Sequence, residues 1–210
     1  MNPLEHAPLG KNSDNPQSYD PGLLFGISRQ INREKLGLAQ APPFVGVDIW
    51  NAYELSWLNM KGKPQIAVAT FLVPANSPNI IESKSWKLYL NSLNNRRFKD
   101  EKELLEILKA DLSKVAQATV SASLNSTETI LKNGFVELEG QLLDRLDIEV
   151  DLNQSPNAEL LSCDKTQGLT EECLVSHLIR SNCPVTGQPD WASLQIKSRS
   201  AITKNSTNIV

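Results

Sequence analysis

An apolar run at residues 66–73 constrains the fold of this chain more than any other feature. The run is rich in branched side chains and is closed by Pro74. Because both of its faces are apolar, it predicts a strand buried between a sheet neighbour and covering helices. It is far shorter than the ~20 residues that a membrane-spanning helix needs, so we expect no membrane segment.

The residues before this run predict the other arm of a β-hairpin. Apolar and more polar residues alternate from Asp48 to Trp57, and Lys61, Gly62 and Lys63 provide a turn between the two arms. Residues 80–90 then predict a strand end that runs into a short helix, with hydroxyl side chains able to cap it.

A second, longer helix is expected from Asp100 onward. Asp100 and Glu103 have the spacing of a capping box, in which each residue binds a backbone N–H at the helix start. Strand candidates follow at residues 119–124 and 135–148. This order predicts an α+β fold with helices on one face of an antiparallel sheet. The apolar stripe of the helix comprises Leu104, Leu105, Ile107, Leu108, Leu112 and Val115.

The second half of the chain repeats the opening pattern only in part. Strand candidates at 158–162, 169–179 and 192–196 resemble the first hairpin, but no helical pattern follows them. We therefore expect an incomplete second unit. The expected segments are a lead-in that hugs the surface and adds little core (1–47), a first unit (48–150), a partial second unit (151–197) and a polar tail (198–210).

The charge balance excludes a broad basic surface. The 21 Lys and Arg residues are offset by 24 Asp and Glu residues, which leaves a net charge of −3. No long nucleic acid is therefore expected as a direct partner, although a nucleotide-sized ligand remains possible. The N-terminal residues lack the apolar stretch of a signal peptide, so the expected compartment is the reducing cytoplasm.

The cysteines and histidines do not predict a metal site. Cys163, Cys173 and Cys183 lack C-x-x-C spacing, and the chain has only His6 and His177 besides. Cys183 lies in a polar loop with Asp190 nearby. A cysteine is the best nucleophile among side chains, and a carboxylic acid can donate a proton if burial raises its pKa. The alternative is an ordinary thiol and a turn residue.

The segment from Ile81 to Ser85 is the second candidate site. A strand end that passes into a helix N-terminus can present N–H groups to a phosphate, and Lys84 adds a positive charge. Glu82 could accept hydrogen bonds from a purine-like base. The alternative is a helix cap whose charges are merely solvated. No glycine-rich G-x-G-x-x-G loop exists, so a dinucleotide would not be held in Rossmann fashion.

Taken together, these segments resemble the long, tandem form of the NADPH-dependent 7-cyano-7-deazaguanine reductase family, the QueF nitrile reductases. The resemblance runs in colinear order over residues 8–197. It is carried by Leu9-Gly10-Lys11, Tyr19-Asp20, Asn32-Arg33, Leu36-Gly37-Leu38, Asp48-Ile49-Trp50, the stretch 53–59, the signature Ile81-Glu82-Ser83-Lys84-Ser85, the stretch 87–91, Ser181-Asn182-Cys183 and Gln188-Pro189-Asp190-Trp191.

The resemblance implies a tunnelling fold with two tandem units and a homodimer as the assembly. It implies that Cys183 attacks the nitrile carbon of 7-cyano-7-deazaguanine to form a thioimide, that Asp190 supplies protons, and that NADPH delivers two hydrides. The product would be the aminomethyl base of the queuosine tRNA modification. Ile81, Glu82 and Ser83 match substrate-binding positions, and Ser83 and Lys84 match positions that hold NADPH.

The chain departs from the family pattern after Ile196. The helices with a His-Glu pair that grips the base, and a later Arg-Gly pair that contacts NADPH, do not follow. We therefore expect a truncated form. An alternative is a catalytically impaired remnant that binds a purine-like base or an intact subunit. A zinc-dependent purine- or pterin-handling relative, such as a cyclohydrolase, is disfavoured by the lack of a Cys and His zinc pattern.

Overall fold

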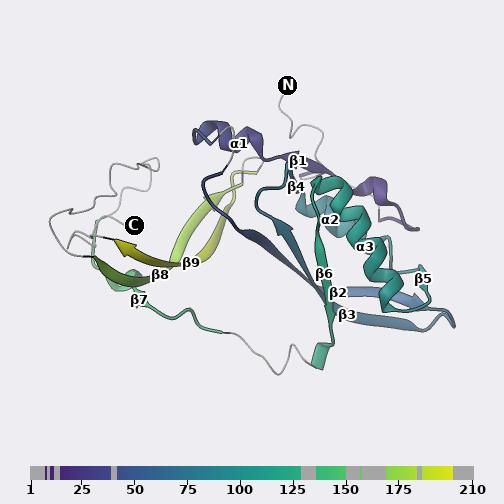
Figure 1. Cartoon of the computed structure of the whole chain (residues 1–210). Coiled ribbons are helices and arrows are strands. Elements are labelled where there is room, and N and C mark those ends of the chain that lie inside the picture. Colours follow the sequence, from purple (N-terminus) through teal and green to yellow (C-terminus); the bar gives the residue numbers. More distant parts are fainter. Residues whose placement is uncertain are drawn as a thin grey trace. The chain divides into compact units, whose positions relative to one another are not determined.

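The computed structural model describes residues 8, 10–11, 15–38, 42–128, 136–149, 157, 169–183 and 186–200. The chain divides into two compact units, Met1–Gly134 and Phe135–Val210, which we call unit 1 and unit 2 and describe separately. Figure 1 shows both units. Among the described residues, no helix combines the length and apolar character needed to cross a membrane.

Unit 1 contains a four-stranded sheet with two helices on one face (Figure 1). The predicted hairpin and the strand near 119–124 are confirmed as three neighbouring antiparallel strands. A short fourth strand pairs in parallel with the first. The sheet order is β5-β2-β3-β6, formed by β2 (Val47–Asn59), β3 (Pro64–Pro74), β5 (Arg97–Phe98) and β6 (Ser121–Asn125), and the helices are α2 (Ser83–Asn91) and α3 (Glu101–Ala116).

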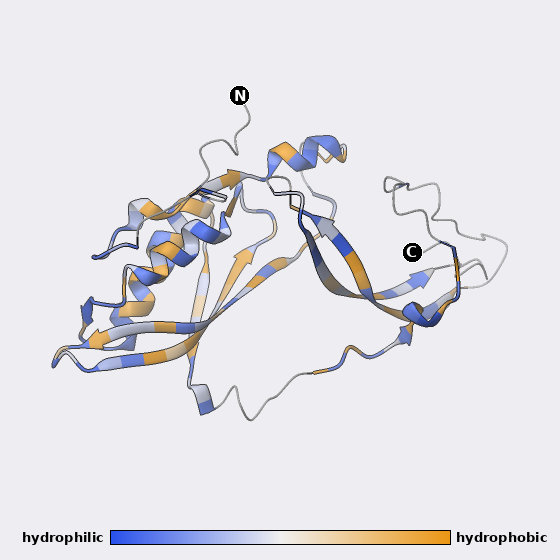
Figure 2. Ribbon diagram, turned by 180° about the vertical axis from the view of Figure 1, so that it is seen from behind, coloured by the Kyte–Doolittle hydropathy of each residue, from blue (hydrophilic) through white to orange (hydrophobic). Residues whose placement is uncertain are grey.

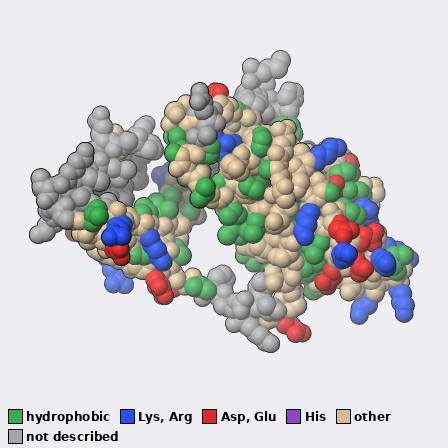
Figure 3. All heavy atoms as spheres, viewed as in Figure 1, with side chains coloured by type: hydrophobic (Ala, Val, Ile, Leu, Met, Phe, Trp, Pro, Cys, Tyr) green, Lys and Arg blue, Asp and Glu red, His purple; other side chains and the backbone are tan. Residues whose placement is uncertain are grey.

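The start of α3 confirms the predicted capping box. The Glu103 backbone N–H donates to Oδ1 of Asp100 at 2.9 Å, and the Lys99 N–H donates to Oε2 of Glu103 at 2.7 Å. The helix ends at Gln117, whose φ of 56° lies in the left-handed region. The side of α3 that faces away from the sheet carries charges of both signs, which Figure 3 shows mixed on the visible surface.

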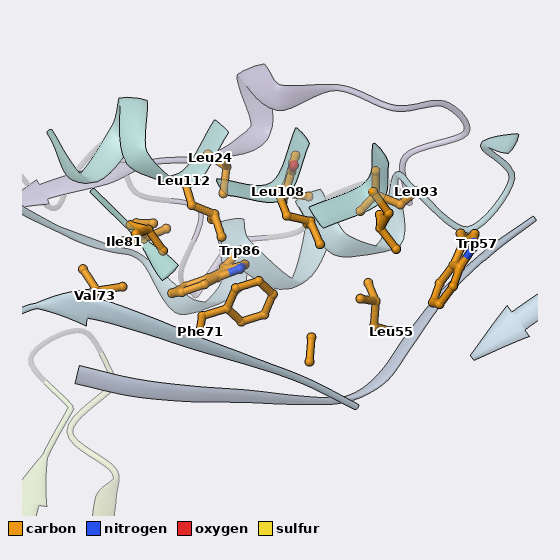
Figure 4. Close-up of a cluster of buried hydrophobic side chains, with 14 of the residues drawn as sticks. Leu24, Leu55, Trp57, Phe71, Val73, Ile81, Trp86, Leu93, Leu108 and Leu112 are labelled. Atoms are coloured by element: carbon orange, nitrogen blue, oxygen red, sulfur yellow. The ribbon is translucent and has the colours of Figure 1, made fainter. Parts of the chain in front are cut away.

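The hydrophobic core of unit 1 lies between the helices and the sheet (Figure 4). Leu104, Leu108 and Leu112 of the predicted stripe are fully buried there. Figure 2 shows the corresponding hydrophobic bands on the helices and strands. Trp86 of α2 packs against Phe71 of β3, with ring centroids 5.3 Å apart. Core burial of this kind is the main stabilising contribution in a domain of this size.

The lead-in contributes more to unit 1 than expected. Leu24 is buried in the core, and Tyr19 packs against it. The lead-in also adds a strand to a separate two-stranded sheet, in which Gly26 lies opposite Ile81. Its elements are η1 (Pro21–Leu23), β1 (Gly26–Ser28) and α1 (Gln30–Lys35), and β1 pairs with β4 (Asn79–Ile81).

Unit 2 contains a three-stranded sheet of order β7-β8-β9. The strands predicted at 169–179 and 192–196 are confirmed and are longer than expected, while the candidate at 158–162 and the tail beyond Ser200 lie outside the described residues. The elements are β7 (Gln141–Leu142), η2 (Leu143–Arg145), β8 (Thr170–Asn182) and β9 (Pro189–Ser200).

The predicted strand at 135–148 is wrong for most of its length. Within 136–149, only Gln141 and Leu142 pair with a neighbour, in parallel with β8. The chain then turns into η2, which buries Leu143 to 4% exposure. The apolar alternation therefore does not mark a continuous strand. It marks a segment that pairs briefly with β8 and then buries the Leu143 side chain.

The two hairpins share a β-bulge at a similar place. In β2 the register shifts between Ala52 and Leu55, so that two residues lie opposite one residue of β3. In β8 the same shift falls between Ser176 and Ile179. Bulges bend a strand and re-aim its side chains, so the partial repeat noted in the sequence extends to backbone detail.

Candidate functional site

Glu82 forms the N-cap of α2 with both of its carboxylate oxygens. Oε1 accepts from the backbone N–H of Lys84 at 2.8 Å, and Oε2 accepts from the N–H of Ser85 at 2.7 Å. Glu82 is buried to 4% exposure. The capping alternative is thus what this segment does in the structure, and the negative carboxylate also lies at the favourable end of the helix dipole.

This cap corrects the expectation that α2 offers its N–H groups to a phosphate. Two of the N–H groups in the first turn, those of Lys84 and Ser85, already donate to Glu82. Oε1 of Glu82 also accepts from the Ser83 hydroxyl at 3.4 Å. A carboxylate has about four lone-pair sites, so one remains beyond these three bonds, and a second is released when the Ser83 hydroxyl turns toward a ligand. Ser83 is exposed beside it, and the Nζ of Lys84 donates to the carbonyl of Lys11.

A cleft of about 560 Å³ lies between α2 and β2 in unit 1. Its volume falls in the range of small-molecule sites. Trp50 and Trp86 form an aromatic wall, with ring centroids 4.9 Å apart and ring planes tilted by 38°. Lys87 and Glu54 form an exposed ion pair at 2.9 Å. The lining residues are Trp50, Asn51, Ala52, Tyr53, Glu54, Leu55, Phe71, Ser83, Trp86, Lys87, Leu90, Asn91 and Asn94.

The cleft brings Ser83 together with residues that were not predicted to bind a ligand. The β2 bulge at Tyr53 and Glu54 forms part of its lining, and Trp86 carries a buried indole N–H that has no hydrogen-bond partner in the structure. A bulge is not visible in sequence alternation, which explains why this cleft was missed. The signature residues Lys84 and Glu82 lie at the N-terminus of the same helix.

Cys183 lies at the start of the turn between β8 and β9 in unit 2. It is half-buried. Its N–H donates to the carbonyl of Gln188 at 2.8 Å, and its carbonyl accepts from the N–H of Gly187 at 2.9 Å. These bonds continue the ladder past Asn182 and set Cys183 opposite Gln188.

Asp190 shares a face of this hairpin with Cys183. Asp190 lies opposite Ser181, so the two side chains share a face. Side chains alternate between the two faces of a strand, so Cys183, two residues after Ser181, returns to that same face. Diagonal neighbours of this kind lie roughly 7–8 Å apart. The pair is therefore within reach of one small ligand, and Asp190 is exposed in unit 2.

The predicted residues divide between the two units. Unit 1 holds Ile81, Glu82, Ser83 and Lys84, and unit 2 holds the thiol and carboxyl of the hairpin turn. Ile81 is buried to 2% exposure in the core, and its backbone lies opposite Gly26 in the two-stranded sheet.

A polar cluster at the β8 bulge was not foreseen. Asp144 accepts from the Ser176 hydroxyl at 2.8 Å and from the His177 backbone N–H at 3.0 Å. Desolvation acts to raise the pKa of Asp144, but these hydrogen bonds outweigh it and hold the pKa below its usual value. The His177 ring contacts the Ser193 hydroxyl at 2.7 Å.

The described part of the chain contains no group of three His, Cys, Asp or Glu side chains placed to hold a metal ion.

Known proteins match this chain over most of its length. A family model described as nitrile reductase, 7-cyano-7-deazaguanine-reductase N-term, matches residues 15–124. A protein of Cupriavidus necator named NADPH-dependent 7-cyano-7-deazaguanine reductase is 55% identical over 92% of this chain and 70% of its own length. Proteins with the same name from Burkholderia vietnamiensis and Ralstonia nicotianae are 55% and 51% identical, over 93% and 94% of this chain and 71% and 72% of theirs.

Proposed function

The chain belongs to the NADPH-dependent 7-cyano-7-deazaguanine reductase family, and we propose that it reduces the nitrile of 7-cyano-7-deazaguanine to an aminomethyl group in queuosine biosynthesis. The observation that carries the proposal is the colinear match across both units, which includes the turn with Cys183 and Asp190 on one face. The reaction is a four-electron reduction that consumes two hydrides and two protons.

Cys183 would make this reduction accessible by covalent capture. Its sulfur adds to the nitrile carbon, a C–S bond forms, and the thiol proton moves to the nitrile nitrogen, which gives a thioimide. Asp190, as a diagonal neighbour of Cys183, would carry protons to the nitrogen. One hydride added at the carbon then breaks the C–S bond, and the sulfur leaves as a thiolate that takes up one proton. The imine that remains accepts the second hydride at carbon and the second proton at nitrogen, which gives the aminomethyl product. Covalent capture thus divides one difficult reduction into two easier steps.

Glu82 is the group that would recognise the base. A deazaguanine presents adjacent N–H donors, and a carboxylate can accept from two of them. The backbone bonds that hold both Glu82 oxygens fix the carboxylate in one orientation, which lowers the entropy lost on binding. The main chain of Ile81 and the hydroxyl of Ser83 would complete the contact with the substrate.

Ser83 and Lys84 suit the negative charge of NADPH. An exposed hydroxyl and an ammonium group lie together at the start of α2, and both can bind phosphate oxygens. When bound, NADPH supplies the hydrides. The N–H groups of Lys84 and Ser85 are committed to Glu82, so the Ser83 hydroxyl and the Lys84 ammonium group would hold NADPH instead.

The proposal extends to fold and assembly. We assign unit 1 and unit 2 to the two tandem tunnelling-fold modules of a cytoplasmic homodimer, with residues 1–47 as the lead-in of the first and 198–210 as the tail of the second. The modules then divide at 134/135, whereas the sequence segments 48–150 and 151–197 divide at 150/151. The bulge common to both hairpins supports the tandem assignment. The exposed Ile49, Tyr53 and Ile66 on β2 and β3 support association, because exposed apolar groups often mark interfaces.

Intact mass measurement tests the chemistry directly. We expect the protein mixed with 7-cyano-7-deazaguanine to gain one adduct, which disappears in Cys183→Ala. Cys173→Ala is the matched control, since Cys173 is a half-buried thiol of β8, the strand that leads into the Cys183 turn, and it donates to the Glu139 carbonyl. An adduct that survives in Cys183→Ala, or none in the wild type, would contradict the proposal.

NADPH consumption separates turnover from capture. Oxidation of NADPH that depends on the nitrile base, at two equivalents per base, is expected for the full reaction. Adduct formation with no NADPH oxidation would instead favour the alternative of a remnant that binds without turnover.

A further inference from the structure

The lead-in residues 19–25, which we call the strap, lie along one side of α2. The backbone N–H of Asp20 donates to the Ser92 hydroxyl at 3.3 Å, and the N–H of Phe25 donates to the Ser85 hydroxyl at 3.1 Å. Glu82 also binds the Phe25 carbonyl, and the Tyr89 ring lies 6.3 Å from that of Tyr19. Positions 82, 85, 89 and 92 are spaced by three and four residues, so they form one stripe at the start of and along the helix. The cleft described above uses a different stripe, which includes Lys87 and Asn91.

Both ends of the strap are fixed. At one end, the Tyr19 hydroxyl donates to Oδ2 of Asp111 at 2.7 Å, and the Arg96 guanidinium lies 3.9 Å from the centre of the Tyr19 ring. At the other end, the chain enters β1, where Gly26 pairs with Ile81. Because both ends of the strap are held, the residues between them keep a fixed position against α2.

The strap and α2 enclose Glu82 in a ring of three hydrogen bonds. The Glu82 N–H donates to the Phe25 carbonyl at 2.9 Å. The Phe25 N–H donates to Oγ of Ser85 at 3.1 Å, and the Ser85 hydroxyl donates back to the Glu82 carbonyl at 2.7 Å. Ser85 is fully buried, so no water competes for these bonds.

We infer that Ser85 is a positioning residue for the base-binding carboxylate, acting through Phe25 of the strap to fix the backbone of Glu82. This inference rests on the proposed function, because it assumes that Glu82 recognises the substrate base. Loss of the ring lets the Glu82 peptide move and weakens recognition of the base. The capture step at Cys183 is left intact.

Ser92 provides a matched control within the same helix. Its hydroxyl also accepts from a strap N–H, that of Asp20, and donates to the carbonyl three residues earlier, that of Tyr89, at 2.6 Å. Ser92 is buried to 2% exposure. The two serines thus make equivalent bonds, but only those of Ser85 form a ring with Glu82.

The test measures the concentration of 7-cyano-7-deazaguanine that gives half of the maximal adduct at Cys183, by peptide mass. We expect Ser85→Ala to raise this concentration at least about fivefold, as for loss of ordinary hydrogen bonds, with the maximal adduct unchanged. Hydrogen exchange of the Glu82 amide should accelerate in parallel. Ser92→Ala should leave both quantities within about twofold, since its bonds do not touch Glu82.

Equal shifts in Ser85→Ala and Ser92→Ala would overturn the inference and leave the proposed function standing. A wild-type protein that forms no adduct would overturn both. If Ser85→Ala does not fold, Ser85→Cys keeps the volume and weakens the bonds, and it should shift the concentration in the same direction. An unchanged value in that folded variant would also overturn the inference.

Discussion

The Tyr89 hydroxyl donates a 2.6 Å hydrogen bond to Oδ2 of Asp111 and so joins α2 to α3 inside unit 1. The Tyr19 hydroxyl donates to the same oxygen. Burial is the main cause that raises the pKa of Tyr89 far above its usual range, and the hydrogen bond to Asp111 adds to it. The pKa of Tyr19 is raised for the same two reasons.

Unit 1 should therefore lose stability at alkaline pH. The folded-state pKa of Tyr89 is above its unfolded value near 10, so its contribution is complete below pH 10 and is lost as the pH rises further. The loss is about 1.4 kcal/mol per pH unit for one such group. Urea unfolding at pH 8 and pH 11 measures it.

Tyr89→Phe should lower the free energy of unfolding at pH 8 and reduce its dependence on pH above 10. Tyr53→Phe is the control, because Tyr53 is 67% exposed. Equal alkaline losses in the two variants would contradict a role for the buried tyrosine.

Asp100→Ala should destabilise unit 1 by about 1 kcal/mol, the usual cost of losing an N-cap. The change removes the bond to the Glu103 N–H and leaves the core intact. Thermal unfolding would show a lower Tm. Glu106→Ala is the control on the exposed face of α3, where Glu106 has only a 3.9 Å ion pair with Lys102, and we expect a change within ~0.5 kcal/mol. A comparable loss in both variants would contradict the capping role.

Asp190→Asn should slow turnover while covalent capture persists. The amide cannot transfer a proton, and general acid catalysis contributes roughly 10²- to 10⁴-fold. We expect NADPH oxidation to fall by about that factor, with an adduct still visible by intact mass. Gln195→Ala, on the same strand, serves as the comparison, since the half-buried Gln195 side chain donates to the Glu139 carbonyl and has no role in the proposed proton transfer. Undiminished oxidation in Asp190→Asn would exclude Asp190 as the proton donor.

Local patterns predicted the elements whose cause is local. The hairpin follows from alternation and a Gly-containing turn. The start of α3 follows from Asp100 and Glu103, whose side chains accept from the backbone N–H groups of Glu103 and Lys99 within one turn. The buried leucines of α3 follow from helical spacing alone. These features need no information from distant parts of the chain.

The features that were missed depend on distant contacts. The strap appears polar and turn-rich in sequence, yet Tyr19 binds Asp111 across 92 positions. The cap of α2 is the exception, because it is local: Glu82 accepts from the N–H groups of its own first turn, which was the alternative to a phosphate site in the sequence analysis. The strand expected at 135–148 failed because burial of Leu143 outweighs local alternation.

Gly140→Ala should weaken the docking of β7 on β8. Gly140 has a φ of 148°, and an added Cβ would lie 2.8 Å from the Cys173 carbonyl oxygen, so the backbone must shift. We expect a cost on the order of 2 kcal/mol in unit 2. Gly187→Ala is the comparison, because its φ is 71° but nothing lies within 4 Å of the new Cβ. Hydrogen exchange along β8 should accelerate more in Gly140→Ala, and the reverse order would contradict the close approach.

Asp144 should make the β8 bulge sensitive to acid. Its folded-state pKa is lowered by the His177 and Ser176 bonds, so its stabilising effect is present above the unfolded value near 4 and is lost as the pH falls through the folded value. We expect the protection factor of the His177 amide to drop between pH 6 and pH 3, as measured by hydrogen exchange and corrected for intrinsic rates. In Asp144→Asn the protection factor of the His177 amide should no longer change between pH 6 and pH 3, because the side-chain amide of asparagine does not titrate in this range. A drop of equal size in Asp144→Asn would show that another group controls the bulge.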